Sequence, residues 1–444
     1  MSITPRISAA LISSRGRHVR VSEDGCLKVA QWLAKEHLDE NVEQQIADFM
    51  PKFGSMPDVE LAQYIFFLDL LNFSFFNDDG TSLEIIYPNQ EGKEKRISRG
   101  YWAHVAALHR AKKEGNPFLQ SEWMIQCSKN DMSQFYRKAD GQLGESEQMS
   151  ELRSKVVNEA GQILMKEYGG YFANMISKCN QSAIKLSQLL ADNFESFRDE
   201  GWFPYEQIDQ VSGNWRDNEI IENDWKLKLC PTDEDNNEIK LDQNINEFQK
   251  HGQIPLHRVT FHKRAQITAT DIWKIFNGQN LGQFNDMSLI TMFADYRVPQ
   301  VLAHLGAIEY SKSLENFLGI GGQKDEQKRN EGITSVSNCD YIVNGSRIEM
   351  EIRGCSIAAI SKITEMMLHS LGIELSNLDQ FEDEKVTNEE NEVRKGLSLR
   401  KLAEQSGFST KICDAIIDNF LWVWGKMHLS ELRIAAHRTR TCFY

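Results

Sequence analysis

Apolar residues recur at helical spacing along most of the chain, with one interruption. The spacing in residues 26–38 and 59–73 predicts two helices, and the second is apolar on so many sides that we expect it to be buried. Residues 83–98 place β-branched and aromatic positions on either side of a turn-rich centre, which predicts a short hairpin. A helix is expected to resume near Arg99. The N-terminal third is therefore predicted to be helices broken by one hairpin.

The helical pattern continues through the rest of the chain. Gly169 and Gly170 separate two predicted helices. The predicted helices lie at residues 151–168, 171–194, 262–276 and 299–319, after residue 353, and at 410–428. The last of these is apolar around most of its circumference, which is typical of a buried helix.

Two polar, acidic stretches, at residues 206–256 and 376–396, predict surface insertions. The fold class that follows is mainly α, with a small β-hairpin element. We expect an N-terminal helical region with the hairpin at residues 1–145 and a helical catalytic region, which carries both insertions, at residues 146–444.

The net charge of the chain limits the classes of molecule that it is expected to bind. The 444-residue chain has 64 acidic and 50 basic side chains, a net charge of −14. Proteins that bind long polynucleotides neutralise many phosphates with clustered Lys and Arg, so this balance disfavours direct stable binding of tRNA or DNA. A single phosphate on a small molecule stays compatible, because two or three local cations are enough to bind it.

No apolar run approaches the roughly 20 residues needed to cross a bilayer, and the N-terminus lacks a signal-peptide pattern. We expect a cytoplasmic enzyme, with the nucleus as a second location, and no contact with a membrane. The eight cysteines form no Cys-x-x-Cys pair and the histidines no His-Glu-x-x-His pattern, so neither a metal nor another cofactor is expected. The sequence does not indicate an oligomeric state.

Asp418 is an acidic residue within the apolar sequence IIDNFLW. An ionised carboxylate without a partner is costly there, so such a group is usually paired or functional. Near the anomeric carbon of a nucleotide it could act as a nucleophile or stabilise a sugar cation, as carboxylates do in glycoside hydrolysis. The alternative is an exposed stripe shared with Asp414, one turn earlier.

The segment MFADYRVPQ, residues 292–300, brings a carboxylate, a phenol and a guanidinium to the start of a helix whose first turn contains Pro299. Phe293 could stack on a base, and Asp295 could accept two hydrogen bonds from a guanine-like edge. Arg297 is a further candidate for substrate binding. The alternative is that Asp295 caps the helix or pairs with Arg297.

Two adjacent cations, Lys263 and Arg264, precede a helix and are candidates for binding a phosphate, although such side chains often pair with acidic neighbours. Residues 72–76, NFSFF, end a buried helix and offer aromatic platforms. Phe73 and Phe75 are therefore candidates for contact with a substrate. Core packing is the alternative interpretation of both phenylalanines.

Several short motifs together resemble the queuosine salvage family, and they stand in the family's order. They lie at residues 72–76, 100–102, 263–266, 291–306 and 351–356. The closing residues His437, Arg438, Arg440 and Tyr444 resemble that family's C-terminus, so the similarity covers most of the chain outside the acidic stretches.

The resemblance implies a helical fold related to that of DNA glycosylases. It also implies cleavage of the N-glycosidic bond of queuosine 5′-phosphate, without a metal, to give ribose 5-phosphate and queuine for salvage into tRNA. The family's nucleophilic aspartate falls on Asp418, and its base-binding phenylalanine and aspartate fall on Phe293 and Asp295. Lys263 is the second residue expected to take part in catalysis, through electrostatics at the phosphate or the leaving base.

The chain departs from the family pattern at two positions of the last helix. An Asp-Tyr pair followed by another aspartate in familiar members is Asp418-Asn419 with Val423 here, which makes Asn419 a candidate for an altered substrate contact. A histidine often found before the motif at 72–76 is also absent, with Met50 near its position. These departures leave a second function open, a non-catalytic protein that binds queuine or a related 7-deazaguanine nucleotide.

A DNA-binding module is a further alternative, because residues 399–409 and the helix after them mimic a helix-turn-helix. That second helix has only Lys411 as a cation on its early turns and is too apolar for a major groove. The sequence therefore favours an enzyme or a small-molecule binding protein.

Overall fold

The computed structural model of the protein is mainly helical. It describes residues 3–35, 56–75, 83–88, 95–138, 144–205, 214–231, 248–251, 254–319, 342–372, 393, 395–397, 399–400 and 412–444. Strands within these ranges are short and antiparallel. The predicted mainly α fold is therefore confirmed, whereas its relation to DNA glycosylases stays a prediction.

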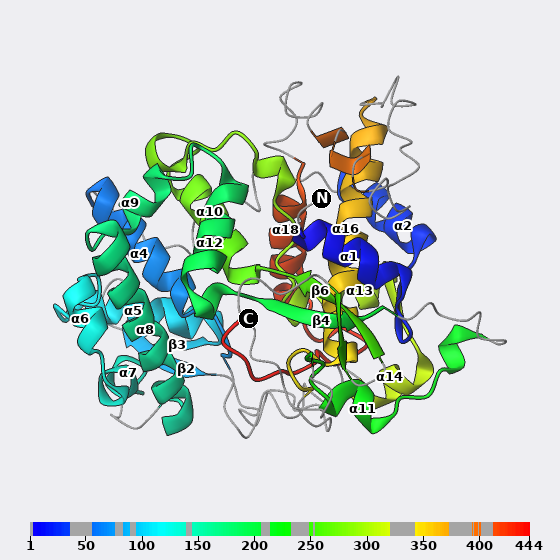
Figure 1. Cartoon of the computed structure of the whole chain (residues 1–444), viewed down its shortest axis with the longest axis horizontal. Helices are drawn as coiled ribbons and strands as arrows, with labels where there is room; N and C mark the ends of the chain where they lie inside the picture. The colour runs from blue at the N-terminus through cyan, green and yellow to red at the C-terminus, as the bar shows by residue number, and fades with distance from the viewer. Residues whose placement is uncertain are drawn as a thin grey trace.

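Two groups of helices lie side by side, with α18 between them (Figure 1). The first group contains α4 (Asp58–Leu70), α5 (Tyr101–Lys113), α6 (Ser121–Gln126), α7 (Lys129–Phe135), α8 (Glu147–Tyr168), α9 (Phe172–Ser177), α10 (Ala183–Asn193) and α12 (Lys263–Ile275). The second contains α1 (Pro5–Ser14), α2 (Glu23–Lys35), α11 (Glu222–Lys226), α13 (Arg297–Leu305), α14 (Lys312–Leu318) and α16 (Arg347–Ser370). Helix α18 spans Asp414–Met427.

Small sheets join parts of the chain that are distant in sequence. The strands are β1 (Val19–Val21), β2 (Glu84–Pro88), β3 (Lys95–Arg99), β4 (Glu200–Pro204), β5 (Phe248–His251), β6 (Ile254–Thr260) and β7 (Ile308–Tyr310). β1 pairs with β7, and β4, β6 and β5 form a sheet in that order. The β2–β3 pair, in which Glu84 lies opposite Arg99, confirms the predicted hairpin.

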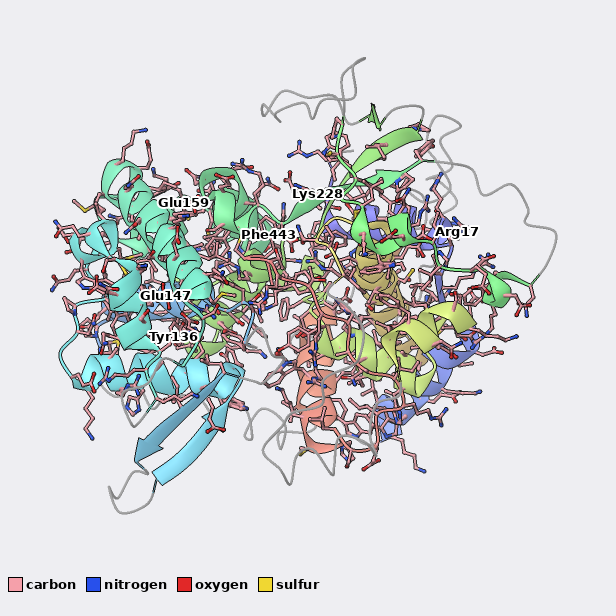
Figure 2. All side chains as sticks on the ribbon, turned by 90° about the horizontal axis from the view of Figure 1, so that it is seen from below. Arg17, Tyr136, Glu147, Glu159, Lys228 and Phe443 are labelled. Atoms are coloured by element: carbon pink, nitrogen blue, oxygen red, sulfur yellow. The ribbon has the colours of Figure 1, made fainter. Side chains whose placement is uncertain are left out.

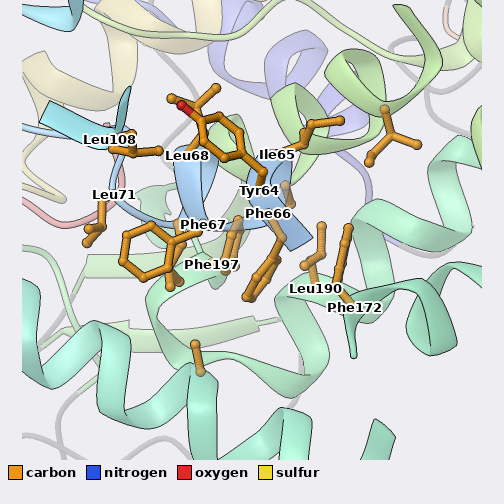
Figure 3. Close-up of a cluster of buried hydrophobic side chains, with 14 of the residues drawn as sticks. Tyr64, Ile65, Phe66, Phe67, Leu68, Leu71, Leu108, Phe172, Leu190 and Phe197 are labelled. Atoms are coloured by element: carbon orange, nitrogen blue, oxygen red, sulfur yellow. The ribbon is translucent and has the colours of Figure 1, made fainter. Parts of the chain in front are cut away.

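The first core cluster fills the space within the first group of helices. Helix α4 contributes side chains from most of its circumference, as Figure 3 shows for Tyr64, Ile65, Phe66 and Phe67. Each of these residues is at most 1% exposed. Phe66 stacks on Phe172 of α9, with ring centroids 4.6 Å apart. The prediction that residues 59–73 form a buried helix is confirmed.

The second core cluster packs around α16 and includes side chains from α1 and α2. The two clusters meet at α18 and at the segment before α13. Phe293 belongs to the first cluster, whereas its neighbours Met292 and Ala294 belong to the second. On α18, Ala415 packs in the first cluster and Ile417 in the second. Side chains at this boundary can therefore contact both halves of the molecule.

The C-terminal segment runs across the same boundary (Figure 1). Figure 2 shows Phe443 between Glu147 of α8 and Arg17, which lies next to β1. The backbone N–H of Ser74, in the middle of the NFSFF motif, donates to the carbonyl of Tyr444 at 3.3 Å. The chain end thus ties the first group of helices to the second.

Three predictions change in detail. The predicted helix at 299–319 is two helices, α13 and α14, because Gly306 takes a left-handed φ angle of 78° and strand β7 follows it. The predicted helix at 171–194 is two helices, α9 and α10, because Asn180 and Gln181 take left-handed φ angles of 53° and 59°. The predicted surface insertion at 206–256 is too wide, since Leu229 and Leu256 are 6% and 0% exposed and pack in the second core cluster. Part of this stretch forms the short strands β5 and β6, and short strands of this kind produce little local pattern that would predict them from sequence.

Parts of other predictions lie outside the described residues. These are residues 206–213, 232–247 and 376–392 of the two acidic stretches, and residues 401–411, most of the segment that mimics a helix-turn-helix. The division of the chain at residue 145 stays a prediction. Among the helices that the structure describes, none has the length and apolar character to span a membrane.

Candidate active site

Asp418 lies on α18 at the boundary between the core clusters and is 3% exposed. Its Oδ1 accepts a hydrogen bond from the backbone N–H of Phe293 at 3.2 Å. Within the described chain this is the carboxyl group's one hydrogen bond. The alternative of an exposed stripe with Asp414 is wrong, because Asp414 is 0% exposed.

The surroundings of Asp418 disfavour its charge. Burial first, and then the neighbouring Asp295 carboxylate, raise the pKa of Asp418 well above its ordinary value. The Phe293 N–H and the ammonium of Lys263 act in the opposite direction and lower the pKa, but they do not outweigh burial. The ionised form of the Asp418 carboxyl group is therefore stabilised by any additional positive charge nearby.

Asp295 holds the N-terminus of α13 with one of its two oxygens. Oδ1 accepts hydrogen bonds from the backbone N–H groups of Arg297 and Val298 at 2.8 and 3.0 Å, so the helix-capping alternative is confirmed for this oxygen. Oδ2 receives no hydrogen bond from the residues that the structure describes. The helix thus fixes the carboxylate and leaves one oxygen available to a ligand.

Lys263 is the first residue of α12 and lies among these carboxyl groups. Its backbone N–H donates to Oδ2 of Asp199 at 3.1 Å, and its Nζ donates to the carbonyl of Asn72 at 3.3 Å. Burial lowers the pKa of Lys263 to about 8, while Asp295, Asp69 and Asp418 act to raise it. The structure thus brings Lys263, Asp295 and Asp418 together from three different helices or helix ends.

Arg264, the second predicted phosphate ligand, is used inside the core. It is 1% exposed, and its guanidinium donates to the carbonyls of Asp69 and Leu70 at the end of α4 and to that of Ser196. These bonds fix α4 against the segment before β4. Of the two adjacent cations, Lys263 is therefore the one that lies beside the candidate catalytic carboxyl.

A second pair of acids, Asp69 and Asp271, lies near Lys263. Burial first, and then the charge of Asp271, raise the pKa of Asp69 well above its ordinary value. Burial raises the pKa of Asp271 to about 6, and Lys263 lowers the pKa of both acids. This pair was not predicted, although an aspartate within the apolar run at 59–73 is a visible signal in the sequence.

Phe73 and Phe75 lie inside the first core cluster. The guanidinium groups of Arg153 and Arg264 lie over the Phe73 ring, 4.6 and 5.0 Å from its centroid. The Phe75 ring stacks on His104, with centroids 5.4 Å apart. The core-packing alternative therefore describes both phenylalanines, and their contact with a substrate stays a prediction.

Aromatic rings from α5 and α18 meet one helical turn beyond Asp418. Tyr101 and Trp102 have ring centroids 5.2 Å apart, and Trp422 of α18 lies 5.9 Å from each of them. Phe293, which is 5% exposed, comes from the loop whose N–H binds Asp418. Aromatic rings therefore lie one helical turn from Asp418 and in the loop that binds it, and such rings can stack on a planar base.

Arg353 of α16 connects the segments that carry the site. Its Nε donates to the carbonyl of Ala294 at 2.9 Å, between Phe293 and Asp295 in sequence. Its guanidinium also binds Asp199 at 2.9 and 2.5 Å, and Asp199 in turn accepts the backbone N–H of Lys263. One arginine thus positions both the Asp295 loop and the start of α12.

Glu349 and Tyr444 complete this buried network. Glu349 Oε1 accepts hydrogen bonds from Arg353 at 3.0 Å and from the Tyr444 hydroxyl at 2.9 Å. The Tyr444 ring centroid lies 4.2 Å from the Arg353 guanidinium carbon. The motif at residues 351–356 and the C-terminal motif therefore have a structural reason to occur together, although no role was predicted for either.

The comparison with protein families decides what these motifs belong to. The model of the queuosine salvage protein family matches residues 53–211 and 239–444. This chain belongs to the queuosine salvage family. The matched residues include Lys263, Asp295, Arg353 and Asp418.

Named members of the queuosine salvage family align with nearly the whole chain. A protein of Bos taurus called queuosine 5′-phosphate N-glycosylase/hydrolase is 27% identical over 447 residues, which cover 100% of this chain and 99% of that protein. Proteins of the same name from Nematostella vectensis and Schizosaccharomyces pombe are each 28% identical. Their alignments cover 99% and 80% of this chain, and 98% and 84% of the respective relatives.

Two departures from the queuosine salvage pattern lie on α18, Asn419 directly after Asp418 and Val423 more than one helical turn after it. The side-chain Nδ2 of Asn419 is buried and has no hydrogen-bond partner among the described residues. Val423 is 8% exposed. A buried amide donor beside the carboxyl group is a position where an acceptor on a ligand would gain a hydrogen bond, so the assignment of Asn419 to substrate binding stays a prediction.

Arg297 also lies beside this site. Its Nη1 donates to Oε1 of Gln300 at 2.5 Å, and its backbone N–H donates to Oδ1 of Asp295.

In the described ranges no cluster of three or more His, Cys, Asp or Glu side chains could hold a metal ion. The expectation that no metal takes part stays a prediction.

Proposed function

We propose that this chain hydrolyses the N-glycosidic bond of queuosine 5′-phosphate and so releases queuine for salvage into tRNA. Support comes from membership of the queuosine salvage family and from the names of the similar proteins of Bos taurus and Nematostella vectensis. The observation that carries the proposal is the buried Asp418 carboxyl, held by the Phe293 N–H between the two core clusters.

The proposed reaction exchanges one bond at the anomeric carbon of the ribose. The oxygen of water bonds to this carbon, and the carbon's bond to the base nitrogen breaks. The electron pair of the broken bond leaves with the base, which takes up a proton, so the products are queuine and ribose 5-phosphate. A 7-deazaguanine has carbon in place of N7 and cannot be activated by protonation there, so the protein supplies the stabilisation.

Asp418 stabilises or captures the positively charged sugar in this mechanism. A carboxylate in a site with little water interacts strongly with a developing cation, because the surroundings screen the charges weakly. The same burial raises the pKa of Asp418 in the empty site. The sugar cation therefore supplies the positive charge that the ionised carboxyl lacks before substrate binds.

Asp295 and Phe293 hold the base. Oδ1 of Asp295 is engaged by the start of α13, which fixes the orientation of Oδ2 toward the donors of a guanine-like edge. Phe293 supplies a ring for stacking from the same loop, and its backbone N–H orients Asp418. One short segment thus relates the position of the base to that of the catalytic carboxyl.

Lys263 supplies positive charge near the carboxyl groups of Asp295 and Asp418. Its ammonium lowers the pKa of Asp418 and so favours the ionised form that stabilises a sugar cation. It also favours negative charge on the departing base. The role is electrostatic and needs the protonated amine.

The test is incubation of the purified protein with queuosine 5′-phosphate, queuosine and guanosine 5′-phosphate, with free base followed by chromatography. We expect queuine from the 5′-phosphate and no guanine from guanosine 5′-phosphate. Absence of queuine release from both queuosine substrates would remove the glycosylase proposal.

A non-catalytic protein that binds queuine or a related nucleotide is the second candidate, since Asn419 and Val423 replace residues that are tyrosine and aspartate in familiar members. The same incubation separates the two functions, because tight binding of queuosine 5′-phosphate without release of base would favour sequestration. Reversion of both residues, Asn419→Tyr with Val423→Asp, would then be expected to restore turnover.

We also propose that the chain acts on the free nucleotide in the cytoplasm or nucleus rather than on intact tRNA. The net charge of −14 supports this, because it opposes the binding of a long polyanion. A filter-binding titration with deacylated tRNA at low salt tests this part, and we expect no saturable binding.

A further inference from the structure

A second lysine, Lys426, lies on α18 beside the proposed active site. Its Nζ is 5.1 Å from the centroid of the Trp422 ring. Within the described part of the chain it forms neither a hydrogen bond nor an ion pair. Burial, and then repulsion from Arg297, lower the pKa of Lys426 to about 7, whereas Asp295 raises it. Lys426 is partly exposed, so its amine can be reached by a ligand from solvent.

Arg297 and Lys426 are brought together by the close packing of α13 on α18. A β-carbon on Gly425 would lie 3.6 Å from Cδ of Arg297 and 2.4 Å from Cγ2 of Val301. Only a glycine allows α13 this approach, and the residue after it is Lys426. Two cations in one partly buried place repel each other, and an anion between them reverses that effect.

The spacing along α18 relates this pair of cations to the catalytic carboxyl. Asp418, Trp422 and Lys426 follow one another at intervals of four residues, so they lie on one side of the helix. Eight residues of α-helix span about 12 Å, and a lysine side chain on a helix leans back toward the N-terminus. A ribose with its anomeric carbon at Asp418 can therefore extend its 5′ end along α18 toward Lys426.

Lys263 is poorly placed to bind the phosphate itself. The carboxyl groups of Asp295, Asp69 and Asp418 all act on its ammonium. A phosphate dianion among three acidic groups would be repelled by each of those that is ionised. Around Lys426 positive charge prevails, because Arg297 adds a second cation and, among the residues that the structure describes, Asp295 is the one acid that acts on the amine.

We propose that Arg297 and Lys426 form the subsite for the 5′-phosphate of the substrate. The inference rests on the proposed function and makes Lys426 a residue that determines the preference for a nucleotide over a nucleoside. The phosphate accepts charge-assisted hydrogen bonds from both side chains. Lys263 is then left to the electrostatics of the carboxyl groups and the departing base.

Calorimetric titration with ribose 5-phosphate and with ribose tests the subsite without turnover. The variants are Lys426→Met, which keeps an unbranched side chain against Trp422, Lys426→Arg, which keeps the charge, and Lys185→Met as a control on the exposed surface of α10. We expect Lys426→Met to weaken binding of ribose 5-phosphate on the order of 10- to 100-fold, the effect of one charge-assisted hydrogen bond. Lys426→Arg and Lys185→Met should bind as the unaltered protein does. Thermal unfolding checks that each variant is folded.

Kinetics then separates this subsite from the proposed function. We expect Lys426→Met to lower kcat/KM for queuosine 5′-phosphate by the same factor, mainly through KM, with no effect on any turnover of queuosine. Equal losses with both substrates, or unchanged binding of ribose 5-phosphate, would overturn the subsite. If the unaltered protein releases base from neither substrate, the proposed function fails, while a loss of ribose 5-phosphate binding confined to Lys426→Met still supports the subsite.

Discussion

Asp414 and Asp418 lie one turn apart on α18, and the protein surrounds their carboxyl groups with opposite charges. Asp414 is 2.9 Å from Arg6 and 3.0 Å from Arg400, and although burial raises its pKa, these two cations lower it below the ordinary value. Asp418 has no arginine partner in the described chain, and burial raises its pKa. The first carboxylate stabilises the fold, whereas the second is stabilised only when further positive charge arrives.

Asp414→Asn should destabilise the protein. It leaves Arg6 without its carboxylate in a buried place, so we expect the free energy of unfolding to fall by roughly 3–5 kcal/mol, measured with urea at pH 7. The exposed residue Asp192 on α10 provides the matched control, and Asp192→Asn should change the same quantity by less than about 0.5 kcal/mol. Equal stability of Asp414→Asn and the unaltered protein would contradict a structural role for this ion pair.

Acid should remove the contribution of Asp414. Because its folded pKa lies below the unfolded value of about 4, the ion pair contributes fully above pH 4. The contribution is then lost as the pH falls through the folded pKa. Urea unfolding of both proteins between pH 7 and acid should therefore show a difference that narrows toward low pH. A constant difference would argue against the ion pair as its cause.

Asp418→Asn should have the opposite effect on stability. A carboxyl with a raised folded pKa is protonated more readily in the folded than in the unfolded state, so it costs stability once the pH rises above the unfolded pKa. Removal of the charge should increase the free energy of unfolding at pH 7 by roughly 0.5–2 kcal/mol. The gain should vanish below the unfolded pKa of about 4. A less stable Asp418→Asn protein at pH 7 would show that the carboxylate is structurally required.

Arg353→Met should damage the fold and the site together. The substitution leaves Asp199 and Glu349 buried without their cation, which costs roughly 3–5 kcal/mol of unfolding free energy. It also removes the bond to the Ala294 carbonyl, so kcat should fall even at temperatures where the variant is folded. Circular dichroism and turnover at low temperature measure the two effects separately. A folded variant with normal kcat would show that Arg353 does not position the Asp295 loop.

Lys263 should impose an alkaline limit on activity. The pKa of Lys263 is about 8, and the amine loses its charge as the pH rises through that value. Because the protonated form stabilises the Asp418 carboxylate, kcat measured at saturating substrate should decline above about pH 8, whereas loss of charge from Lys426 acts mainly on KM. Lys263→Met should be slow at all pH values and lack this alkaline decline. A decline that persists in Lys263→Met would assign it to another group.

The sequence predicted the parts of the fold that have a local pattern. The buried helix α4, the β2–β3 hairpin and the apolar helix α18 all follow from apolar periodicity and turn residues. The break between α9 and α10 depends on left-handed backbone at Asn180 and Gln181, which a helix-favouring composition conceals. The sheet β4-β6-β5 was missed because its strands pair across a polar stretch.

The sequence predicted only those parts of the candidate site that have a local signal. Asp418 and Asp295 stand out as charges in apolar or helix-start contexts, and the family resemblance gave them roles. The Arg353–Asp199 pair joins residues 154 positions apart, so no spacing in the sequence indicates it. Lys263 and Arg264 are adjacent in sequence but have different roles. The Arg264 guanidinium binds the Leu70 carbonyl at the end of α4, whereas the Lys263 ammonium binds the Asn72 carbonyl and lies near the carboxyl groups of the site.

The most direct test of the proposed role of Asp418 is release of queuine from queuosine 5′-phosphate by the unaltered protein and by Asp418→Asn. We expect release by the unaltered protein and a loss of at least on the order of 100-fold in kcat for Asp418→Asn, with the variant folded and still able to bind the substrate. Full turnover by Asp418→Asn, with unchanged affinity, would contradict the assignment of Asp418 as the residue that stabilises or captures the sugar cation.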